Sequence, residues 1–589
     1  MKVFEANITH QVSDYLNDSL KNVVSIEKAN QKMYEAFGFI HFFDNAEDLQ
    51  ILKETISISQ NIVSEPDRAE YGDFQTNTEL ANKVTFHLTA KSISPKIVIE
   101  PTCGKGNFIV ASLRQFIDIK KVFGIEIYKP YVWESKFNVI DFYLSNPTEN
   151  KPEISIIHSS VFDFDFKAIA KENSTKEILI IGNPPWVTNS KLGSLNSSNL
   201  PKKTNFKNHN GLDAMTGKGN FDIAEYITLM MIETFQHQKG NIALLVKNTV
   251  IKNIVFDQFV KKYTISDIEK HCIDSKKEFN VSVEAALFYC KLNSKPTFDC
   301  AEFDIYNNAN AKLNFGWLSK KFVSNLDTYT NAEQIDGKCP FEWRQGIKHD
   351  CSSIMELDKV NGHFVNGLKE EIKLENNLVY GILKSSDLKN TVVNETRKYT
   401  IITQKKVGQE TNYIKHDFPK TYKYLIEHQD IFSSRKSSIY NNKPPFSIFG
   451  VGDYSFKPYK VAISGLYKTF HFTLVLPQNE KPVMLDDTCY MLGFDKLEFA
   501  VYSLILLNSE TTMQFLQSIT FADAKRTFTK DVLMRIDILK LAQTIDKLEL
   551  QRELNYINET YNFNLTLDLW CDFINEMTPI ESGQIELFA

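Results

Sequence analysis

The residues whose types and spacing most suggest chemistry are Asn183-Pro184-Pro185-Trp186, which follow the apolar run Ile178–Ile181 after Gly182. A short run of large aliphatic residues is typical of a strand covered on both faces of a parallel sheet. In such sheets, ligands bind in the crevice beyond the carboxyl ends of the strands. The four residues are therefore expected to form a loop at a binding site.

This loop offers hydrogen-bond acceptors beside an aromatic face. Its two prolines fix φ and remove two backbone donors, so nearby carbonyl groups are free to face a ligand. Asn183 Oδ1 and the Pro184 carbonyl could each accept one N–H of an amino group on a planar base, while Trp186 stacks on the base. The amino nitrogen would become a nucleophile without a metal. The plainer alternative is a proline turn, with Asn183 as a turn former and Trp186 in the core.

A second motif is an expected strand, a glycine loop and the start of a helix. Its candidate ligand-binding residues are Glu100, Pro101, Gly104, Gly106, Asn107 and Phe108. Glycine lets a backbone approach a ligand closely, although glycines also serve ordinary tight turns. The flanking Val-Ile-Glu-Pro and Asn-Phe sequences favour the ligand-binding interpretation.

The segment before this motif, residues 71–79, starts with Tyr71, contains Thr76 and opens a new helix. We expect Asn77 or Thr78 to cap that helix.

Two acids stand at the ends of later expected strands. Glu126 ends the strand 121–126, about twenty residues beyond the glycine loop, where a carboxylate can hold two ribose hydroxyls. Asp163 follows the strand 154–158 and could accept a hydrogen bond from an adenine amino group. A solvated loop acid is the alternative for each.

The elements that must position these residues alternate between strand and helix. Further buried strands are expected at Gly240–Lys247 and at Glu284–Tyr289, the last of the series, with an apolar helix at Phe221–Phe235 between them and the loop. Alternation of this kind predicts an α/β domain with a largely parallel sheet. The polar stretch Val187–Asn220 is expected to be a functional or disordered loop.

The whole sequence is expected to form four parts: a helical N-terminal arm (residues 1–70), an α/β catalytic domain (71–300), a linker (301–345) and a C-terminal α+β domain (346–589). Apolar residues recur at helical spacing in the arm, which shows no nuclease-like acidic motif.

Composition excludes several classes of protein. With 589 residues, of which 43% are hydrophobic and 24% charged, the chain is ordinary for a globular protein of several domains. It shows no signal peptide or membrane span, so we expect a cytoplasmic protein without a membrane partner. The eight cysteines lack Cys-x-x-Cys spacing, and there is no His-Glu-x-x-His, which predicts no metal site.

The net charge of −6 conceals a basic region. Residues 384–468 contain 15 Lys and Arg against 7 Asp and Glu, interleaved with aromatics and glycines. This mixture suits contacts with nucleic-acid phosphates and bases, and a solvated basic face is the alternative. The candidate DNA-binding residues are Arg435, Lys436, Lys457 and Lys460.

Taken in order, residues 71–78, the glycine motif, Glu126, Asp163 and Asn183–Trp186 resemble the gamma class of DNA adenine-N6 methyltransferases of restriction–modification systems. The resemblance covers about residues 71–300 and, more loosely, 340–540. It departs from the family at Thr76-Asn77-Thr78, where Thr-Pro-Pro is usual, and at Trp186, where Tyr or Phe is commoner.

The resemblance implies a Rossmann-like core that binds S-adenosylmethionine and a C-terminal target-recognition domain for double-stranded DNA, with a cognate restriction endonuclease as partner. It implies that Tyr71 lies at the cofactor site, that Thr76 holds the methionine carboxylate, Glu126 the ribose and Asp163 the cofactor adenine. Asn183, Pro184, Pro185 and Trp186 would form the catalytic turn around a flipped adenine.

Two alternatives remain at this level. The same tetrapeptide could hold the amine of an RNA base or a protein glutamine, although a small protein substrate would not require the basic C-terminal half. The chain could also be a non-enzymatic DNA-binding subunit with a vestigial cofactor site. Intact Gly104, Gly106, Glu126 and Asn183 argue against that reading.

Overall fold

The computed structural model describes residues 2–57, 75–188, 222–307, 311–467, 470–521 and 527–578. The chain divides into two compact units, Met1–Phe322 and Val323–Ala589. The boundary falls inside the stretch 301–345 that was expected to be a linker. Each unit is described by itself.

The first unit is built on a ten-stranded sheet with the order β12-β11-β10-β8-β9-β7-β6-β3-β4-β5. Its strands are β3 (Ile97–Glu100), β4 (Lys121–Glu126), β5 (Glu153–His158), β6 (Ile178–Gly182), β7 (Gly240–Lys247), β8 (Ile265–Ile273), β9 (Ala285–Leu292), β10 (Asp299–Asp304), β11 (Leu313–Leu318) and β12 (Lys321–Val323). The strands β5-β4-β3-β6-β7 are mutually parallel and follow the doubly wound order 3-2-1-4-5. The fold is therefore Rossmann-like.

The expected strands of this region are confirmed, but the sheet continues further than the sequence predicted. Strand β9 is not the last of the series, and it runs antiparallel to both β7 and β8. Strands β10 to β12 add to the sheet where a linker was expected. Apolar runs mark the central strands, since β6 and β7 are buried along almost their whole length, whereas the outer strands are more exposed and carry no such signal.

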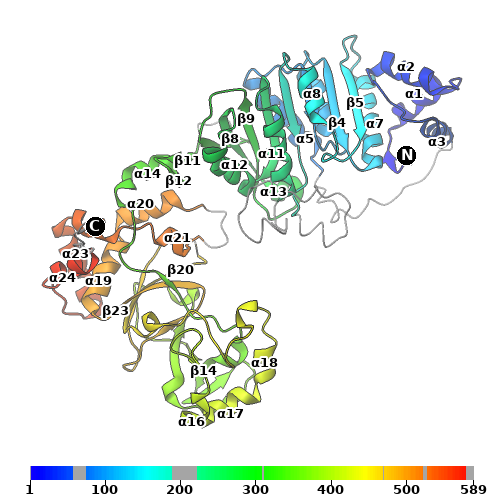
Figure 1. The fold of residues 1–589 in the computed structure, drawn as a ribbon. Coiled ribbons are helices and arrows are strands. Elements are labelled where there is room, and N and C mark those ends of the chain that lie inside the picture. The colour runs from blue at the N-terminus through cyan, green and yellow to red at the C-terminus, as the bar shows by residue number, and fades with distance from the viewer. Residues whose placement is uncertain are drawn as a thin grey trace, which may run out of the picture. The chain divides into compact units, whose positions relative to one another are not determined.

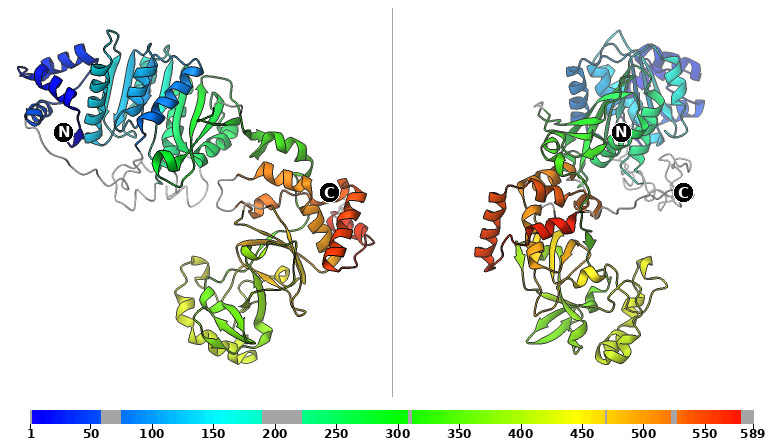
Figure 2. Two further views of the ribbon diagram at one scale, coloured as in Figure 1. Left: turned by 180° about the vertical axis from the view of Figure 1, so that it is seen from behind. Right: turned by 60° about the vertical axis from the view of Figure 1, so that its left-hand side comes forward.

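Helices cover both faces of this sheet, as Figure 2 shows. Contacts join α5 to α6 and α6 to α7 in one layer, and α8 to α11 and α11 to α12 in the other. These helices are α5 (Thr78–Ala90), α6 (Asn107–Gln115), α7 (Lys129–Ser145), α8 (Phe166–Glu172), α11 (Ile223–Phe235) and α12 (Asn248–Lys261). The short helix α13 (Ser275–Phe279) follows β8.

The N-terminal arm is helical in its described part, as predicted, and lies beside α7 at the β5 end of the sheet (Figure 1). It contains β1 (Lys2–Val3), β2 (Ala6–Asn7), α1 (His10–Leu20), α2 (Ile26–Phe37) and α3 (Ala46–Ser57). Thr9 and Ser25 cap α1 and α2 through their side chains. The buried Lys136 of α7 donates to the Phe42 carbonyl at 2.8 Å, which ties the arm to the sheet domain.

The second unit combines two sheets with helices, in agreement with the expected α+β texture. The five-stranded sheet contains, in spatial order, β13 (Arg344–Gln345), β23 (Cys489–Phe494), β20 (Tyr459–Ser464), β21 (Thr473–Val475) and β18 (Val392–Val393). The six-stranded sheet contains β16 (Glu371–Ile372), β15 (His363–Asn366), β14 (Glu356–Val360), β19 (Lys398–Ile401), β17 (Val379–Leu383) and β22 (Met484–Leu485).

The helices of the second unit fall into two groups in Figure 1. Beside β14 lie α16 (Tyr413–Asp417), α17 (Pro419–Glu427) and α18 (Gln429–Ser433), while α15 (Ser352–Met355) precedes β14 directly. The others are α14 (Leu326–Ala332), α19 (Leu497–Leu507), α20 (Glu510–Ile519), α21 (Lys530–Leu533), α22 (Ile538–Thr544), α23 (Lys547–Tyr561) and α24 (Trp570–Met577). Helix α19 is buried from Phe499 to Leu507 and packs against β20.

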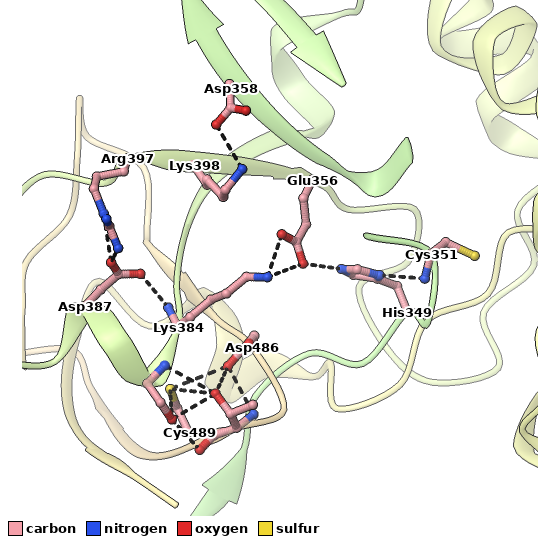
Figure 3. A network of polar contacts seen from close by, with 12 residues as sticks. His349, Cys351, Glu356, Asp358, Lys384, Asp387, Arg397, Lys398, Asp486 and Cys489 are labelled. Carbon is pink, nitrogen blue, oxygen red and sulfur yellow. Dashed lines mark hydrogen bonds and ion pairs between the residues drawn. The ribbon is translucent and has the colours of Figure 1, made fainter. Parts of the chain in front are cut away.

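A largely buried polar network fixes the six-stranded sheet from within (Figure 3). Glu356, at the start of β14, lies 2.6 Å from Lys384 Nζ and 3.6 Å from His349 Nε2. Burial lowers the pKa of His349, and the Glu356 charge partly opposes this. The network explains why some basic residues of this region serve the fold and are not available to a ligand.

None of the helices in the described residues is long and apolar enough to span a bilayer.

Candidate active site

The candidate site lies where the strand order of the sheet reverses, between β3 and β6. These strands pair in parallel, with Ile97 opposite Ile178 and Ile99 opposite Ile180, so the loops that follow them emerge side by side. Gly182 has φ +156°, and a Cβ there would lie 3.2 Å from Glu100 Cγ. The topology thus brings the glycine motif and the Asn-Pro-Pro-Trp turn together, at the place where doubly wound folds bind ligands.

In the turn itself, Asn183 and Pro185 are half-buried and Pro184 is buried. Trp186 is only 6% exposed, and its indole N–H donates to the Leu245 carbonyl at 3.2 Å. Its ring meets the ring of Phe279 edge-on, with centroids 5.0 Å apart. Trp186 thus has the packed position of the plainer alternative, and its expected stacking on a base stays a prediction.

Phe279, the last residue of α13, is a wall of the site that the sequence analysis missed. It lies far from Trp186 along the chain, and no motif surrounds it. Only the pairing of β8 with β9, and of β9 with β7, brings α13 to the turn. No local pattern could have identified it.

The glycine loop is tightly enclosed. Gly104 and Gly106 have φ values of +50° and +78°, which residues with a Cβ rarely adopt. A Cβ on Gly104 would lie 2.5 Å from Gln75 Oε1, and one on Gly106 would lie 2.2 Å from Ser135 Oγ. Both glycines are therefore required by the shape of the loop, and their role in letting a ligand approach stays a prediction.

Glu126 stands beside this loop at the carboxyl end of β4. Its Oε2 accepts from the Gly104 N–H at 2.8 Å, and its Oε1 accepts from the Tyr128 N–H at 2.8 Å. The side chain is buried, with 9% exposure. The carboxylate is thus held beside the glycine loop, and its contact with ribose hydroxyls stays a prediction.

Glu100 is more deeply buried, with 2% exposure, and its Oε2 has no hydrogen-bond partner in the described part of the chain. Burial above all raises the pKa of this carboxyl well above its ordinary value, and the charge of Glu126 adds to the rise. A buried acceptor without a partner is costly, by about 1–3 kcal/mol, which makes Glu100 a candidate ligand for a donor group. Pro101, which follows it, is buried.

Thr76 lies next to the glycine loop, because its carbonyl accepts from Asn107 Nδ2 at 2.7 Å. Its Oγ1 is buried and has no partner among the described residues. Asn77 caps α5 by accepting from the Leu80 N–H at 2.7 Å, as predicted. The Asn107 side chain thus joins the glycine loop to the segment that contains Thr76. Phe108 is 1% exposed and packs in the core.

Two further candidates remain untested. Tyr71 lies outside the described residues. Asp163 is exposed on the turn after β5, where its N–H donates to the Ser160 carbonyl. Its proposed contact with the cofactor adenine stays a prediction.

The four basic candidates of the second unit have different environments. Lys436 is exposed. Arg435 donates to the carbonyls of Phe432 and Ser447 and lies over the Tyr440 ring at 3.6 Å. Lys457 forms an ion pair with Asp495.

Lys460 was assigned wrongly. It is fully buried in β20, and its Nζ donates to the Lys457 carbonyl at 2.6 Å. Burial lowers the pKa of its amine to about 7. A local excess of basic residues does not show which lysines lie inside a sheet, and this one cannot meet phosphate in the folded unit.

The burial of Lys460 predicts that Lys460→Met stabilises the protein at neutral pH by about 1–4 kcal/mol, since a buried amine is replaced by an apolar chain of similar length. The folded pKa of about 7 lies below the unfolded value near 10.5, so the unfolded state binds more protons between these values. Wild-type stability should therefore rise relative to the variant from pH 7 to about pH 10. Urea unfolding at several pH values measures this.

The matched control is Lys457→Met, because the Lys457 side chain is 36% exposed. The difference in free energy of unfolding between wild type and Lys457→Met should not change comparably with pH. A constant stability difference between wild type and Lys460→Met across this range would contradict the assignment of a depressed pKa to Lys460.

Comparison with known proteins places the chain. No protein-family model matches it. Among solved structures, the type IIL restriction–modification enzyme MmeI in complex with DNA aligns with 86% of this chain and 76% of its own, at 12% identity and a TM-score of 0.47. A type I restriction–modification methyltransferase subunit from Streptococcus thermophilus aligns with 51% of this chain and 69% of its own, at 12% identity and a TM-score of 0.27.

A curated relative gives the stronger result. The type II methyltransferase M.NspV of Nostoc sp. is 41% identical over 492 residues, which cover 82% of this chain and 99% of the relative. The aligned length exceeds the first unit, so the similarity extends into the second. The chain therefore belongs to the type II methyltransferases, S-adenosylmethionine-dependent enzymes of restriction–modification systems.

Proposed function

We propose that this chain transfers the methyl group of S-adenosylmethionine to the N6 amino group of adenine in double-stranded DNA. It would act as the modification component of a restriction–modification system, with a cognate restriction endonuclease as its functional partner. The observation that carries the proposal is the meeting of the Asn183 turn with the glycine loop where the strand order reverses. The cofactor can bind at the glycine loop while the turn holds the target amine.

The residues around the glycine loop fit S-adenosylmethionine. A Cβ at Gly104 or Gly106 would collide with Gln75 or Ser135, so the loop keeps a compact backbone beside the buried polar atoms that a cofactor could use. Buried atoms without partners among the described residues are present for both ends of an amino acid: Thr76 Oγ1 for the carboxylate and Glu100 Oε2 for the ammonium. A cation against Glu100 would also favour its ionised form.

The remaining cofactor contacts follow from position. Glu126 would hold the ribose hydroxyls and Asp163 the adenine, as the family resemblance implies. When bound, the cofactor supplies an electrophilic methyl group. Two acids near the loop, Glu100 and Glu126, suit its positive charge.

The turn would serve the target base. Asn183 Oδ1 and the Pro184 carbonyl accept the two N–H groups of the amine, which draws the nitrogen lone pair out of conjugation with the ring. The adenine must leave the DNA stack to reach them. Trp186, fixed by its bond to Leu245, and Phe279, against its ring, supply an aromatic wall for the flipped base.

We propose that the second unit, which contains the predicted target-recognition region 346–589, reads the DNA sequence. Arg435 and Lys436 lie in a surface depression of about 550 Å³. It is lined by Asp350, Cys351, Ser352, Ser353, Ile431, Ser434, Arg435, Lys436 and Ser437. Asp350 is neutralised by Lys348 at 2.7 Å, and the carbonyl bonds of Arg435 fix its guanidinium. Such a surface suits a DNA phosphate.

This proposal predicts that Lys436→Ala weakens DNA binding and reduces the slope of log affinity against log salt by about 0.9, since one phosphate contact is lost. Fluorescence anisotropy with a labelled duplex at several salt concentrations measures the slope. Lys120→Ala, an exposed lysine of the first unit, is the control and should leave the slope unchanged. Equal slopes for wild type and Lys436→Ala would remove Lys436 from the DNA surface.

The chemistry of the product tests the function itself. Purified protein is incubated with S-adenosylmethionine and unmethylated DNA, and the nucleosides are separated by mass spectrometry. We expect N6-methyladenine. N4-methylcytosine would show that the target base is cytosine. Methylation of RNA or of a protein glutamine, but not of DNA, would favour the alternative substrates that the same turn could hold.

A further inference from the structure

Away from the candidate active site, two histidines and a glutamate converge between α5 and β8. His87 comes from α5, and Glu269 and His271 come from β8. Each side chain offers one ligand atom, and these three atoms lie within 4.8 Å of one another. The three residues come from two segments far apart in the sequence, so no closely spaced ligand motif marks them.

The hydrogen bonds of this cluster leave two ring nitrogens over. His271 Nε2 lies 2.7 Å from a Glu269 oxygen, and Lys91 Nζ also lies 2.7 Å from that carboxylate. His87 Nε2 and His271 Nδ1 are buried and have no hydrogen-bond partner among the residues that the structure describes. His271 is only 1% exposed. Buried nitrogens of this kind need a partner, and each exception calls for an explanation.

The packing of the rings keeps the cluster compact. The rings of His87 and His271 meet edge to face, with centroids 4.3 Å apart, and His271 stacks on Phe303 at 5.0 Å. These contacts limit the rotation of His271, so its free nitrogen is held in place. Lys91 Nζ lies 2.7 Å from both oxygens of Glu269, and because Lys91 is 26% exposed it can keep one of them and release the other to a ligand.

We propose that His87, Glu269 and His271 bind one divalent transition-metal ion, with zinc as the expected ion. Two imidazoles and one carboxylate are an established zinc ligand set, with water in the remaining position. The Lys91 ammonium would act from behind as the hydrogen-bond partner that orients the ligating carboxylate. Imidazole and carboxylate ligands also bind cobalt, which allows a spectroscopic test.

The expected role of the ion is to clamp α5 to β8. Helix α5 starts at the cap Asn77, next to Thr76, and β8 leads into α13 and Phe279. At the other end of these elements, Asn77 Nδ2 donates to Glu278 Oε2 at 2.8 Å. The ion would thus fix together the helix that follows Thr76 and the strand that leads into α13 and Phe279. Binding of the ion itself does not depend on the proposed adenine specificity.

The test is metal binding by the full-length protein after dialysis against a chelator. Zinc is titrated in competition with a chromophoric chelator, and cobalt is followed by its visible absorption. We expect one ion per chain, a raised melting temperature with zinc, and a cobalt spectrum without the charge-transfer band that a cysteine ligand would add. His87→Ala should lower zinc affinity by more than about 100-fold, beyond the loss that follows removal of a group behind a ligand.

His10→Ala, an exposed histidine of the same unit, is the matched control and should bind zinc as wild type does. Glu269→Gln is the second variant, for use if His87→Ala does not fold, and it should also lose most of the affinity. Absence of a stoichiometric ion, or equal zinc affinity in wild type, His87→Ala and Glu269→Gln, would overturn the proposal. The edge-to-face ring packing would then be the whole explanation of the cluster.

Discussion

Asn183→Ala should lower the rate of methyl transfer by roughly 100- to 1000-fold while leaving S-adenosylmethionine affinity almost unchanged. The expected loss is that of one preorganised hydrogen-bond group whose bond strengthens in the transition state. Asn183 follows β6 directly and is proposed to accept from the target amine, whereas the cofactor candidates Gly104 and Gly106 lie on the neighbouring loop after β3. Tritium transfer to DNA measures the rate, and isothermal titration measures cofactor binding.

Asn17→Ala, an exposed residue of α1, controls for the substitution itself and should be fully active. Equal turnover of wild type and Asn183→Ala would end the assignment of Asn183 to the amine. Parallel loss of cofactor affinity and activity would instead show that the turn belongs to the cofactor site.

Glu126→Ala should weaken S-adenosylmethionine binding by about 1.5–3 kcal/mol, or roughly 10- to 150-fold, because charge-assisted bonds to the ribose hydroxyls are lost. The structure adds a second reason. Glu126 Oε2 accepts from Gly104 N–H, so its removal also frees the glycine loop. Isothermal titration with S-adenosylmethionine gives the affinity directly.

A suitable control is Glu153→Ala, since Glu153 lies at the opposite, amino end of the adjacent strand β5, in an ion pair with Lys121 at 2.9 Å. Cofactor affinity should be unchanged there. If Glu126→Ala binds as tightly as Glu153→Ala, Glu126 is an ordinary acid of the fold.

Much of the catalytic unit could be predicted because its signals are local. The buried runs of β3, β6 and β7 are almost entirely apolar, and Gly104 and Gly106 stand where their φ values favour glycine. The cap of α5 at Asn77 also follows from a short-range hydrogen bond. Where one segment determines its own structure, the sequence is sufficient.

The remaining features depend on contacts between distant segments. Strand β8 mixes charged residues, of which only Asp267 is exposed, with apolar ones and carries no continuous apolar run, so it was missed. Phe279 reaches Trp186 only through the pairing of β8, β9 and β7. Lys460 is indistinguishable in sequence from the exposed Lys436, and only the sheet around it shows that it is buried. Periodicity and composition contain none of this information.

The most direct test of the proposed function is to express this chain alone in a methylation-free host and to sequence the modified bases of the host DNA. The proposal predicts N6-methyladenine at every copy of one short sequence, and its absence when Asn183→Ala is expressed at the same level. Unmodified DNA with the wild-type chain, or methylation confined to cytosine, would contradict it.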